Sequence, residues 1–259
     1  MKHRAFNVLG NIAIVNFPDD FPSKEKKVFA EKILKENKAI KTVLEKSGKF
    51  KGRLRKMETK WVAGDKTKEV LYRENDCVFR FNIDTTYFSP RLSGERKEVA
   101  DLIKPGEEVL VMFAGVAPFS IVIAKNSKAK KVYSNELNRE ANKYGKLNLE
   151  LNKLKEKVEM VDGDIKKVAL KLKGKCLDVI VMPRPQLKDS FLEQAFMLSK
   201  KGTRIYYYDF YKEEEVDVLK NLVEEEAQKA GKKIKISQIK KAGNIGPGRY
   251  RYRVDFEVL

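Results

Sequence analysis

Residues 107–138, EEVLVMFAGVAPFSIVIAKNSKAKKVYSNELN, decide the fold of this chain. An apolar run over 109–113 ends in small residues around Gly115, an apolar helix-like segment follows, and a second apolar run ends at Glu136. Strand, small-residue turn, helix, strand and terminal acid form the first βαβ half of a nucleotide-binding sheet. In such a half, the glycine lets the backbone approach a ligand closely, and the terminal acid accepts hydrogen bonds from a ribose diol.

The turn itself narrows the choice of ligand. A dinucleotide site has the pattern G-x-G-x-x-G, whereas here the second small position is Ala117 and Pro118 follows it. This departure favours a nucleotide ligand without a pyrophosphate, and S-adenosylmethionine is the common one. We therefore predict an α/β fold with a Rossmann-like class I methyltransferase domain that uses S-adenosylmethionine. Further strands are predicted at 158–161, 177–182, 203–210, 233–239 and 250–258, and helices at 139–152, 190–199 and 212–230.

The ends of the third and fourth predicted strands supply more candidate site residues, because ligands of open α/β sheets sit outside the carboxyl ends of the strands. Asp164 follows the third strand. Two roles stay open for it, accepting a hydrogen bond from an adenine amino group or capping the next helix. The fourth strand continues into Pro183, Arg184 and Pro185, and these prolines predict a rigid wall rather than a flexible loop.

Composition favours an intracellular enzyme that acts on an anionic substrate. The 259 residues suffice for one large domain and a small one, and the formal net charge is +18. Such a charge attracts polyphosphates and makes RNA or DNA the leading partner, although a lysine-rich or heat-adapted proteome would also produce it. Two distant cysteines argue against a disulfide framework or a zinc site, and no apolar run approaches the roughly 20 residues of a membrane span. We expect a cytoplasmic monomer without a metal.

Residues 1–85 are predicted to form a small α+β domain that positions RNA, and residues 86–259 the methyltransferase domain. Ser23 stands where it would cap the first helix of the small domain. Strands are predicted on either side of an early turn and again at 41–45, 69–73 and 77–83. The basic segment that contains Arg53 and Arg55 predicts either a solvated hairpin or an RNA-facing surface with forked donors for phosphate or a base edge.

The segment TYFSPRLSGER, residues 86–96, opens the predicted methyltransferase domain. Pro90 fixes the chain, and Ser93 precedes a helical run as an N-cap would. Taken singly, the aromatic pair at 87–88 could be core, and Glu95 could interact with the helix dipole. Together, two arginines, a glutamate and two aromatics stand where the cofactor turn and an incoming substrate would meet.

Several stretches resemble one family, the archaeal and eukaryotic tRNA (guanine-37-N1) methyltransferases. They are LGNIAIV (9–15), KTVL (41–44), RLR (53–55), YFSPRLSGER (87–96), MFAGVAPFSI (112–121), NLELNKL (148–154) and GRYRYRVDFEV (248–258). The resemblance implies a small domain that positions the anticodon stem-loop of tRNA and a catalytic domain with a deep cofactor site. It also implies an archaeal member that begins after the extra N-terminal domain with which many members bind the tRNA elbow.

The resemblance assigns roles residue by residue. Guanine N1 carries a proton, so a carboxylate must remove it and a cation near O6 must stabilise the charge that develops. Glu95 is predicted as this general base and Arg55 as the group that faces O6. The predicted cofactor contacts are Arg96, Phe113, Ala114, Gly115, Val116, Glu136, Leu137, Asp164, Ile165 and Pro183. The predicted substrate contacts are Arg53, Tyr87, Pro90, Arg91, Arg184 and Pro185.

The chain departs from the family pattern at several positions. Val111 replaces an acid before the turn, Ala117 replaces a glycine, and Pro183 replaces the asparagine that many members have after the fourth strand. A proline at 183 resembles archaeal members that also methylate imG-14, an intermediate of wyosine synthesis. Three further interpretations stay open, namely aminocarboxypropyl transfer in wyosine synthesis, methylation of a small molecule, and a non-catalytic RNA-binding module.

Overall fold

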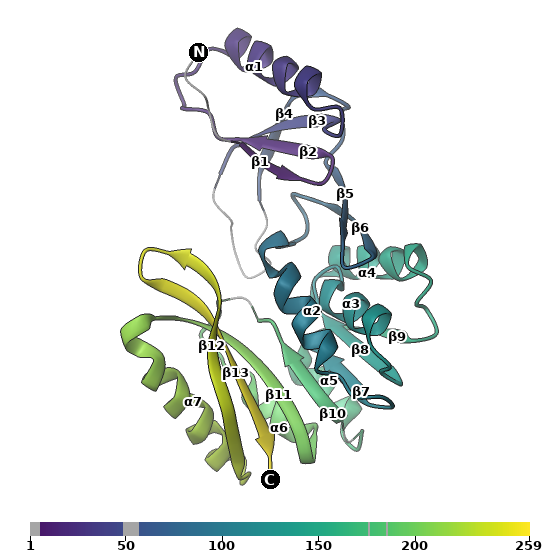
Figure 1. The fold of residues 1–259 in the computed structure, drawn as a ribbon, viewed down its shortest axis with the longest axis vertical. Coiled ribbons are helices and arrows are strands. Elements are labelled where there is room, and N and C mark those ends of the chain that lie inside the picture. The colour runs from purple at the N-terminus through teal and green to yellow at the C-terminus, as the bar shows by residue number, and fades with distance from the viewer. Residues whose placement is uncertain (1–5, 49–56, 176, 185) are drawn as a thin grey trace.

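The computed structural model describes residues 6–48, 57–175, 177–184 and 186–259. A small N-terminal part stands at one end of the molecule and a larger α/β part at the other (Figure 1). Three predicted site residues, Arg53, Arg55 and Pro185, lie outside the described residues. Within the described residues, no helix is both long and apolar enough to cross a membrane.

The N-terminal part is a four-stranded sheet covered by one helix. Its strands, in the order β1-β2-β3-β4, are Phe6–Leu9, Ile12–Val15, Thr42–Lys46 and Thr59–Gly64. Helix α1, Ser23–Glu36, connects the parallel strands β2 and β3, and its Ala30 and Ile33 pack against Val15 and Val43 in a separate core. A parallel pair requires such a crossover, so this half is α+β as predicted.

Two predicted helix caps are wrong. The N-cap of α1 is Pro22, and Ser23 is already the first helical residue. Ser93 is likewise inside α2, Ser93–Asp101, because a 3-10 turn at Pro90–Leu92 runs directly into that helix and gives Ser93 a helical backbone. A serine caps only from the extended residue before a helix, and neither serine occupies that position.

The methyltransferase part is a seven-stranded sheet in the order β12-β13-β11-β10-β7-β8-β9. These strands are, in chain order, β7 Glu108–Val111, β8 Lys131–Glu136, β9 Val158–Asp162, β10 Leu177–Met182, β11 Ser199–Lys212, β12 Ile234–Gly246 and β13 Arg249–Val258. Strands β7 to β11 are parallel, and β13 enters antiparallel between β11 and β12. The carboxyl ends of five parallel strands therefore meet at one edge of the sheet.

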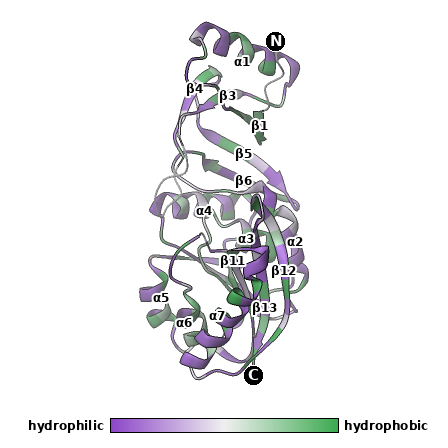
Figure 2. Cartoon of the chain, turned by 90° about the vertical axis from the view of Figure 1, so that its left-hand side faces the viewer, coloured by the Kyte–Doolittle hydropathy of each residue, from purple (hydrophilic) through white to green (hydrophobic). Residues whose placement is uncertain are grey.

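Helices cover both faces of this sheet. Those on one face are α2, α3 (Pro118–Asn126) and α4 (Arg139–Leu151), and those on the other are α5 (Ile165–Leu172), α6 (Leu192–Met197) and α7 (Val216–Lys229). Alternate residues of a central strand face the two cores, as Val109 and Leu110 do on β7. Figure 2 shows mixed hydropathy along α5, α6 and α7, as expected of helices that bury one face. Burial on both sides explains the continuous apolar runs of β7 and β10.

A β-hairpin joins the two parts. It consists of β5, Glu69–Glu74, and β6, Cys77–Asn82. On the N-terminal side, the Asn11 amide accepts a hydrogen bond from the Leu71 backbone N–H at 2.7 Å. The domain boundary predicted at residue 85 stays a prediction.

Two asparagines, one in α4 and one at its C-cap, bind the other edge of the hairpin. Asn152 accepts from the Val78 backbone N–H at 2.9 Å and donates to its carbonyl oxygen at 2.7 Å, and Asn148 accepts from the Arg80 N–H at 2.7 Å. These buried amides replace a neighbouring strand, which explains the spacing N-L-E-L-N at 148–152. Asn148 also donates to the Val116 carbonyl oxygen at 3.1 Å and so links the hairpin to the turn after β7.

Candidate functional site

The turn between β7 and α3 has three left-handed residues. The φ angles are +57° at Phe113, +59° at Gly115 and +67° at Ala117. A Cβ added to Gly115 would lie 3.4 Å from the carbonyl oxygen of Tyr87, so the backbone of the turn and the segment before α2 are closely packed. Ala117 adopts a backbone conformation that usually requires glycine, the residue that the family resemblance leads us to expect there.

Glu136, at the end of β8, connects this turn to the next helix. Its Oε2 accepts from the Gly115 backbone N–H at 2.7 Å, and its Oε1 accepts from the Asn138 N–H at 2.7 Å. The Asn138 side chain in turn caps α4 through the Glu140 N–H at 3.0 Å. The carboxylate therefore lies against the turn after β7, at the strand ends where a nucleoside ribose is bound in folds of this kind.

The end of β9 is tied to the end of β8. The Gly163 N–H donates to the Glu136 carbonyl oxygen at 2.8 Å, and the Asn135 amide donates to Gly163 at 3.0 Å. Asp164 caps α5 by accepting from the Lys166 N–H at 3.0 Å. The capping role left open for Asp164 is thus confirmed, and the same residue also lines the cavity described next.

A cavity that is open to solvent lies along these strand ends. The predicted site residues that line it are Tyr87, Phe113, Gly115, Glu136, Leu137, Asp164, Ile165, Pro183 and Arg184. The lining residues that were not predicted are Leu92, Asn135, Asn138, Ala141, Gly163, Leu187 and Arg251. Most of these unpredicted residues are small or polar neighbours of predicted ones, and only Arg251, on β13, comes from a distant part of the chain.

Other predicted residues do not line this cavity. Ala114 and Val116 are buried in the turn. Arg96 is almost fully buried in an ion pair with Glu74, and Pro90 and Arg91 line a second cavity. The second cavity is also lined by Val8 and Ile14 of the N-terminal sheet. The roles predicted for these residues in binding stay predictions.

Arg184, after β10, forms hydrogen bonds and an ion pair that hold neighbouring residues in place. Its Nη2 donates to the carbonyl oxygens of Leu187 and Asp189, each at 2.6 Å, and its Nη1 lies 2.5 Å from Oδ1 of Asp209. The side chain is 1% exposed. These contacts tie Leu187 and Asp189 to Asp209 of β11, so Arg184 has a structural role whatever it contributes to substrate binding.

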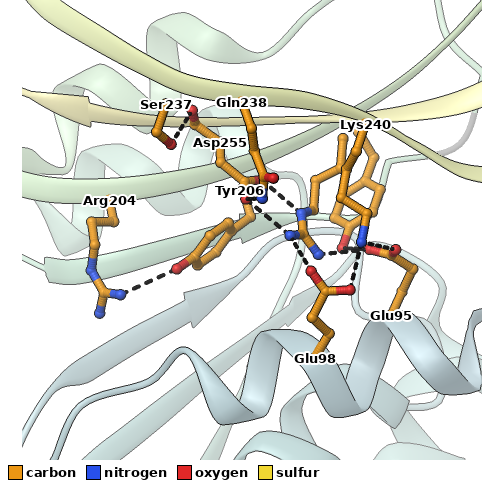
Figure 3. A network of polar contacts seen from close by, with 10 residues as sticks. Glu95, Glu98, Arg204, Tyr206, Ser237, Gln238, Lys240 and Asp255 are labelled. Atoms are coloured by element: carbon orange, nitrogen blue, oxygen red, sulfur yellow. Dashed lines mark hydrogen bonds and ion pairs between the residues drawn. The ribbon is translucent and has the colours of Figure 1, made fainter.

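Glu95 lies outside the cavity lining, one helical turn after Leu92, in a network of buried polar groups (Figure 3). Its Oε2 accepts from Nη1 of Arg253 at 2.8 Å and from the Tyr208 hydroxyl at 3.0 Å. Its Oε1 lies 3.2 Å from Nζ of Lys240. These partners come from β13, β11 and β12, so three strands hold the carboxylate that α2 presents.

The same cations bind two further carboxylates. Glu98, one turn along α2, accepts from Lys240 at 2.5 Å and from Arg253 at 2.7 Å, and Asp255 accepts from Nε of Arg253 at 2.6 Å. Figure 3 shows Glu95 and Glu98 on the helix facing Lys240 on the strands. Arg253 is fully buried, and a buried charge without such partners would be strongly destabilising.

Burial and ion pairing shift the pKa values of three members of the network. Burial and the nearby Glu95 carboxylate raise the pKa of Tyr208 well above its ordinary value, so its hydroxyl stays a donor. Burial alone would raise the pKa of Glu98, but hydrogen bonds from Lys240 and Arg253 hold it below the ordinary value. Burial would lower the pKa of Lys240, yet its bonds to Glu98 and Glu95 raise it.

Sequence reasoning missed Arg251 and Arg253, although a signal was present. The segment YRYRVDF alternates along β13, so Arg251, Arg253 and Asp255 share one face of that strand. Arg251 lines the cavity and Arg253 binds Glu95, and both lie over aromatic rings, Arg251 at 4.9 Å from the Phe210 centroid. An arginine in a strand that is otherwise buried marks a position with a specific anionic partner.

A seven-stranded sheet in this order, with a cavity along the carboxyl ends of its parallel strands, defines a Rossmann-like class I methyltransferase. Within that class, the chain belongs to the TRM5/TYW2 methyltransferase family. The TRM5/TYW2 methyltransferase domain matches residues 70–237, and the TYW2 N-terminal domain matches residues 2–67. The fold class and the family predicted from the sequence are thus confirmed.

Relatives from archaea resemble nearly the whole chain. The tRNA (guanine(37)-N(1))-methyltransferase Trm5b of Pyrococcus abyssi is 34% identical over 255 residues, which are 98% of this chain and 74% of the relative. The tRNA (guanine(37)-N(1))/4-demethylwyosine(37)-methyltransferase Taw22 of Nanoarchaeum equitans is 33% identical and is matched over 98% of this chain and 100% of its own length. The solved complex of aTrm5 with tRNALeu superposes with a TM-score of 0.84 at 27% identity and covers 98% of this chain and 72% of that chain.

The residues of the cavity fit S-adenosylmethionine, the cofactor of this family. Gly115 leaves room that a Cβ would fill, the Glu136 carboxylate would accept from a ribose diol, and Leu137 and Ile165 would supply apolar walls for a base. Asp164 lines the same cavity and would offer an acceptor for an amino group. When bound, the cofactor supplies an electrophilic methyl group, and the remaining chemistry falls to the side chains of the protein.

Proposed function

We propose that this chain transfers a methyl group from S-adenosylmethionine to N1 of guanosine 37 in tRNA. The observation that carries the proposal is Glu95, a carboxylate with 9% of its surface exposed that three donors hold in place, one helical turn after Leu92 of the cavity lining. Guanine N1 is not a nucleophile while it carries its proton, so a positioned carboxylate is the group that the reaction requires. The family and its archaeal relatives support the same reaction.

The two oxygens of Glu95 have different environments, and this difference indicates how the proton is taken. Oε2 has two donors at 3.0 Å or less, which fix the carboxylate in place. Oε1 has the longer contact to Lys240, whose side chain is 30% exposed. We therefore assign Oε1 as the proton acceptor for a target base that enters beside it.

The target base is proposed to leave its stack and enter between Glu95 and the cavity. Tyr87 lines the cavity on the side of α2 and would contact the base. Arg55 is proposed to stabilise the charge that develops on O6, and Arg53 to bind a nearby phosphate or base edge. Pro90, Arg91, Arg184 and Pro185 complete the proposed substrate contacts.

The net charge of +18 supports tRNA as the partner. Because phosphate contacts release counterions, the logarithm of tRNA affinity should fall by several units for each unit of log salt concentration. A tRNA affinity that does not change with salt concentration would contradict the proposal. It would favour the view that the positive charge is a general adaptation of the protein surface. We also propose that the protein acts as a monomer in the cytoplasm.

A second candidate activity is methylation of 4-demethylwyosine at position 37, the intermediate also written imG-14. The specific observation is Pro183, which lines the cavity where many family members have asparagine. A proline lacks the amide donor and acceptor of asparagine, so the wall at this point is apolar and tolerates a larger tricyclic base. The dual name of the Nanoarchaeum equitans relative supports testing both substrates.

The test is mass spectrometry of nucleosides from tRNA incubated with the protein and labelled S-adenosylmethionine. The proposal predicts labelled 1-methylguanosine at position 37. A labelled wyosine derivative would establish the second activity, and an aminocarboxypropyl adduct would replace methyl transfer as the reaction. No incorporation despite cofactor and tRNA binding would contradict both activities.

A further inference from the structure

The charges around Glu95 do not balance. Among the described residues, the network contains three carboxylates, Glu95, Glu98 and Asp255, and two cations, Arg253 and Lys240. Its formal charge is therefore −1, and uptake of one proton makes it neutral. We propose that Glu98 and Lys240 are positioning residues that set the proton affinity of Glu95 in opposite directions. The inference rests on the proposed function of Glu95.

The geometry distinguishes these two residues from the rest of the network. Arg253 is fully buried and holds all three carboxylates, so its loss would disturb the fold. Glu98 and Lys240 are at the solvent side, with 42% and 30% of their side chains exposed. Both act on Glu95, since Lys240 lies 3.2 Å from Oε1 and Glu98 competes for Lys240 at 2.5 Å. They can be replaced without opening a buried site.

Each residue has a simple electrostatic effect. The Glu98 carboxylate opposes a second negative charge one helical turn away and so favours a protonated Glu95. The Lys240 ammonium favours the ionised carboxylate and directs Oε1. The other groups that face Glu95 are Arg253 from β13 and the protonated Tyr208 from β11, and neither changes charge in the working range.

The step that the network serves is methyl transfer to N1 of guanine. The N1–H bond of guanine breaks, and its proton goes to Oε1 of Glu95. The electron pair of that bond stays on the base, and N1 forms its bond to the methyl carbon. The electron pair of the broken carbon–sulfur bond remains on the sulfur. The cluster then carries no net charge until Glu95 releases the proton to solvent.

The test is single-turnover methyl transfer as a function of pH, with Glu98→Gln and Lys240→Met. Glu98→Gln removes a negative charge, so the acid limb of the rate profile should move down by about one pH unit and the plateau rate should fall several-fold. Lys240→Met removes a positive charge, so its acid limb should move up by about one pH unit. Lys240→Arg retains the charge, so the acid limb of its rate profile should stay at the pH of the parent.

Lys241→Met is the matched control. Lys241 is the next residue on β12, and its ion pair with the exposed Glu213 at 2.8 Å lies away from Glu95. The acid limb of the Lys241→Met rate profile should match that of the parent, and thermal melting would show that every variant is folded. Acid limbs of Glu98→Gln and Lys240→Met that move in the same direction, or that both stay in place, would overturn the inference. A parent that does not methylate guanosine 37, or a Glu95→Gln protein that keeps the parent rate, would instead overturn the proposed function.

Discussion

The cofactor cavity and the network around Glu95 are neighbouring regions built in different ways. The polar rim of the cavity consists of backbone groups and short side chains at successive strand ends, such as Gly115, Glu136 and Asp164. The network joins side chains that are far apart in sequence, since Tyr208 lies 113 positions and Arg253 lies 158 positions after Glu95. We infer that the cavity binds the cofactor and that the network performs proton transfer. Variants should separate these two roles.

The largest expected effect on stability is that of Arg253→Met. The substitution leaves Glu95 and Asp255 as buried carboxylates without their main partner, which should lower the free energy of unfolding by about 3–5 kcal/mol. Urea unfolding measures this loss. The control is Arg249→Met, at an exposed position on the same strand. Equal, small losses in the two variants would mean that the network does not stabilise the fold.

A smaller effect, confined to the cavity, is expected for Glu136→Ala. A charged hydrogen bond to the ribose diol contributes about 1.5–3 kcal/mol, so the affinity for S-adenosylmethionine should fall roughly 10- to 150-fold. Asp162→Ala is the control, because Asp162 ends β9 but pairs with exposed Lys146 at 2.8 Å outside the cavity lining. Titration calorimetry that gives the parent affinity for Glu136→Ala would remove Glu136 from the site.

The smallest effect is expected for Ala117→Gly. Relief of the left-handed backbone at φ +67° should gain about 1–2 kcal/mol. Loss of a buried methyl group costs about 0.8 kcal/mol, and the freer unfolded chain costs about 0.4–1 kcal/mol. The terms nearly cancel, so the free energy of unfolding should change by less than about 1 kcal/mol. A loss above about 2 kcal/mol would show that packing of this buried methyl group outweighs the backbone strain.

The sequence predicted the cavity better than the network, for a physical reason. A strand, a small-residue turn and a terminal acid are local features, so Gly115 and Glu136 could be located from spacing alone. Asp164 showed the limit of that approach, because a capping residue and a ligand contact have the same sequence signature, and the structure gives it the cap while leaving it in the cavity.

The partners of Glu95 depend on how distant strands pair. β13 enters the sheet antiparallel between β11 and β12, and only this order brings Tyr208, Lys240 and Arg253 to one carboxylate. The two serine caps failed for a similar reason, since a serine before a helical period does not reveal whether a proline or a 3-10 turn already starts the helix. Long-range pairing and the exact starting residue of a helix are both set by tertiary structure.

Single-turnover methyl transfer by Glu95→Gln tests the division between binding and proton transfer most directly. Glutamine keeps the shape of the side chain and removes the proton acceptor, so the rate on tRNA should fall by roughly 10²–10⁴. The affinities for S-adenosylmethionine and tRNA should stay at the parent values, and higher pH should restore part of the rate because solvent can then deprotonate N1. A Glu95→Gln protein that melts at a lower temperature but transfers methyl groups at the parent rate would contradict the account.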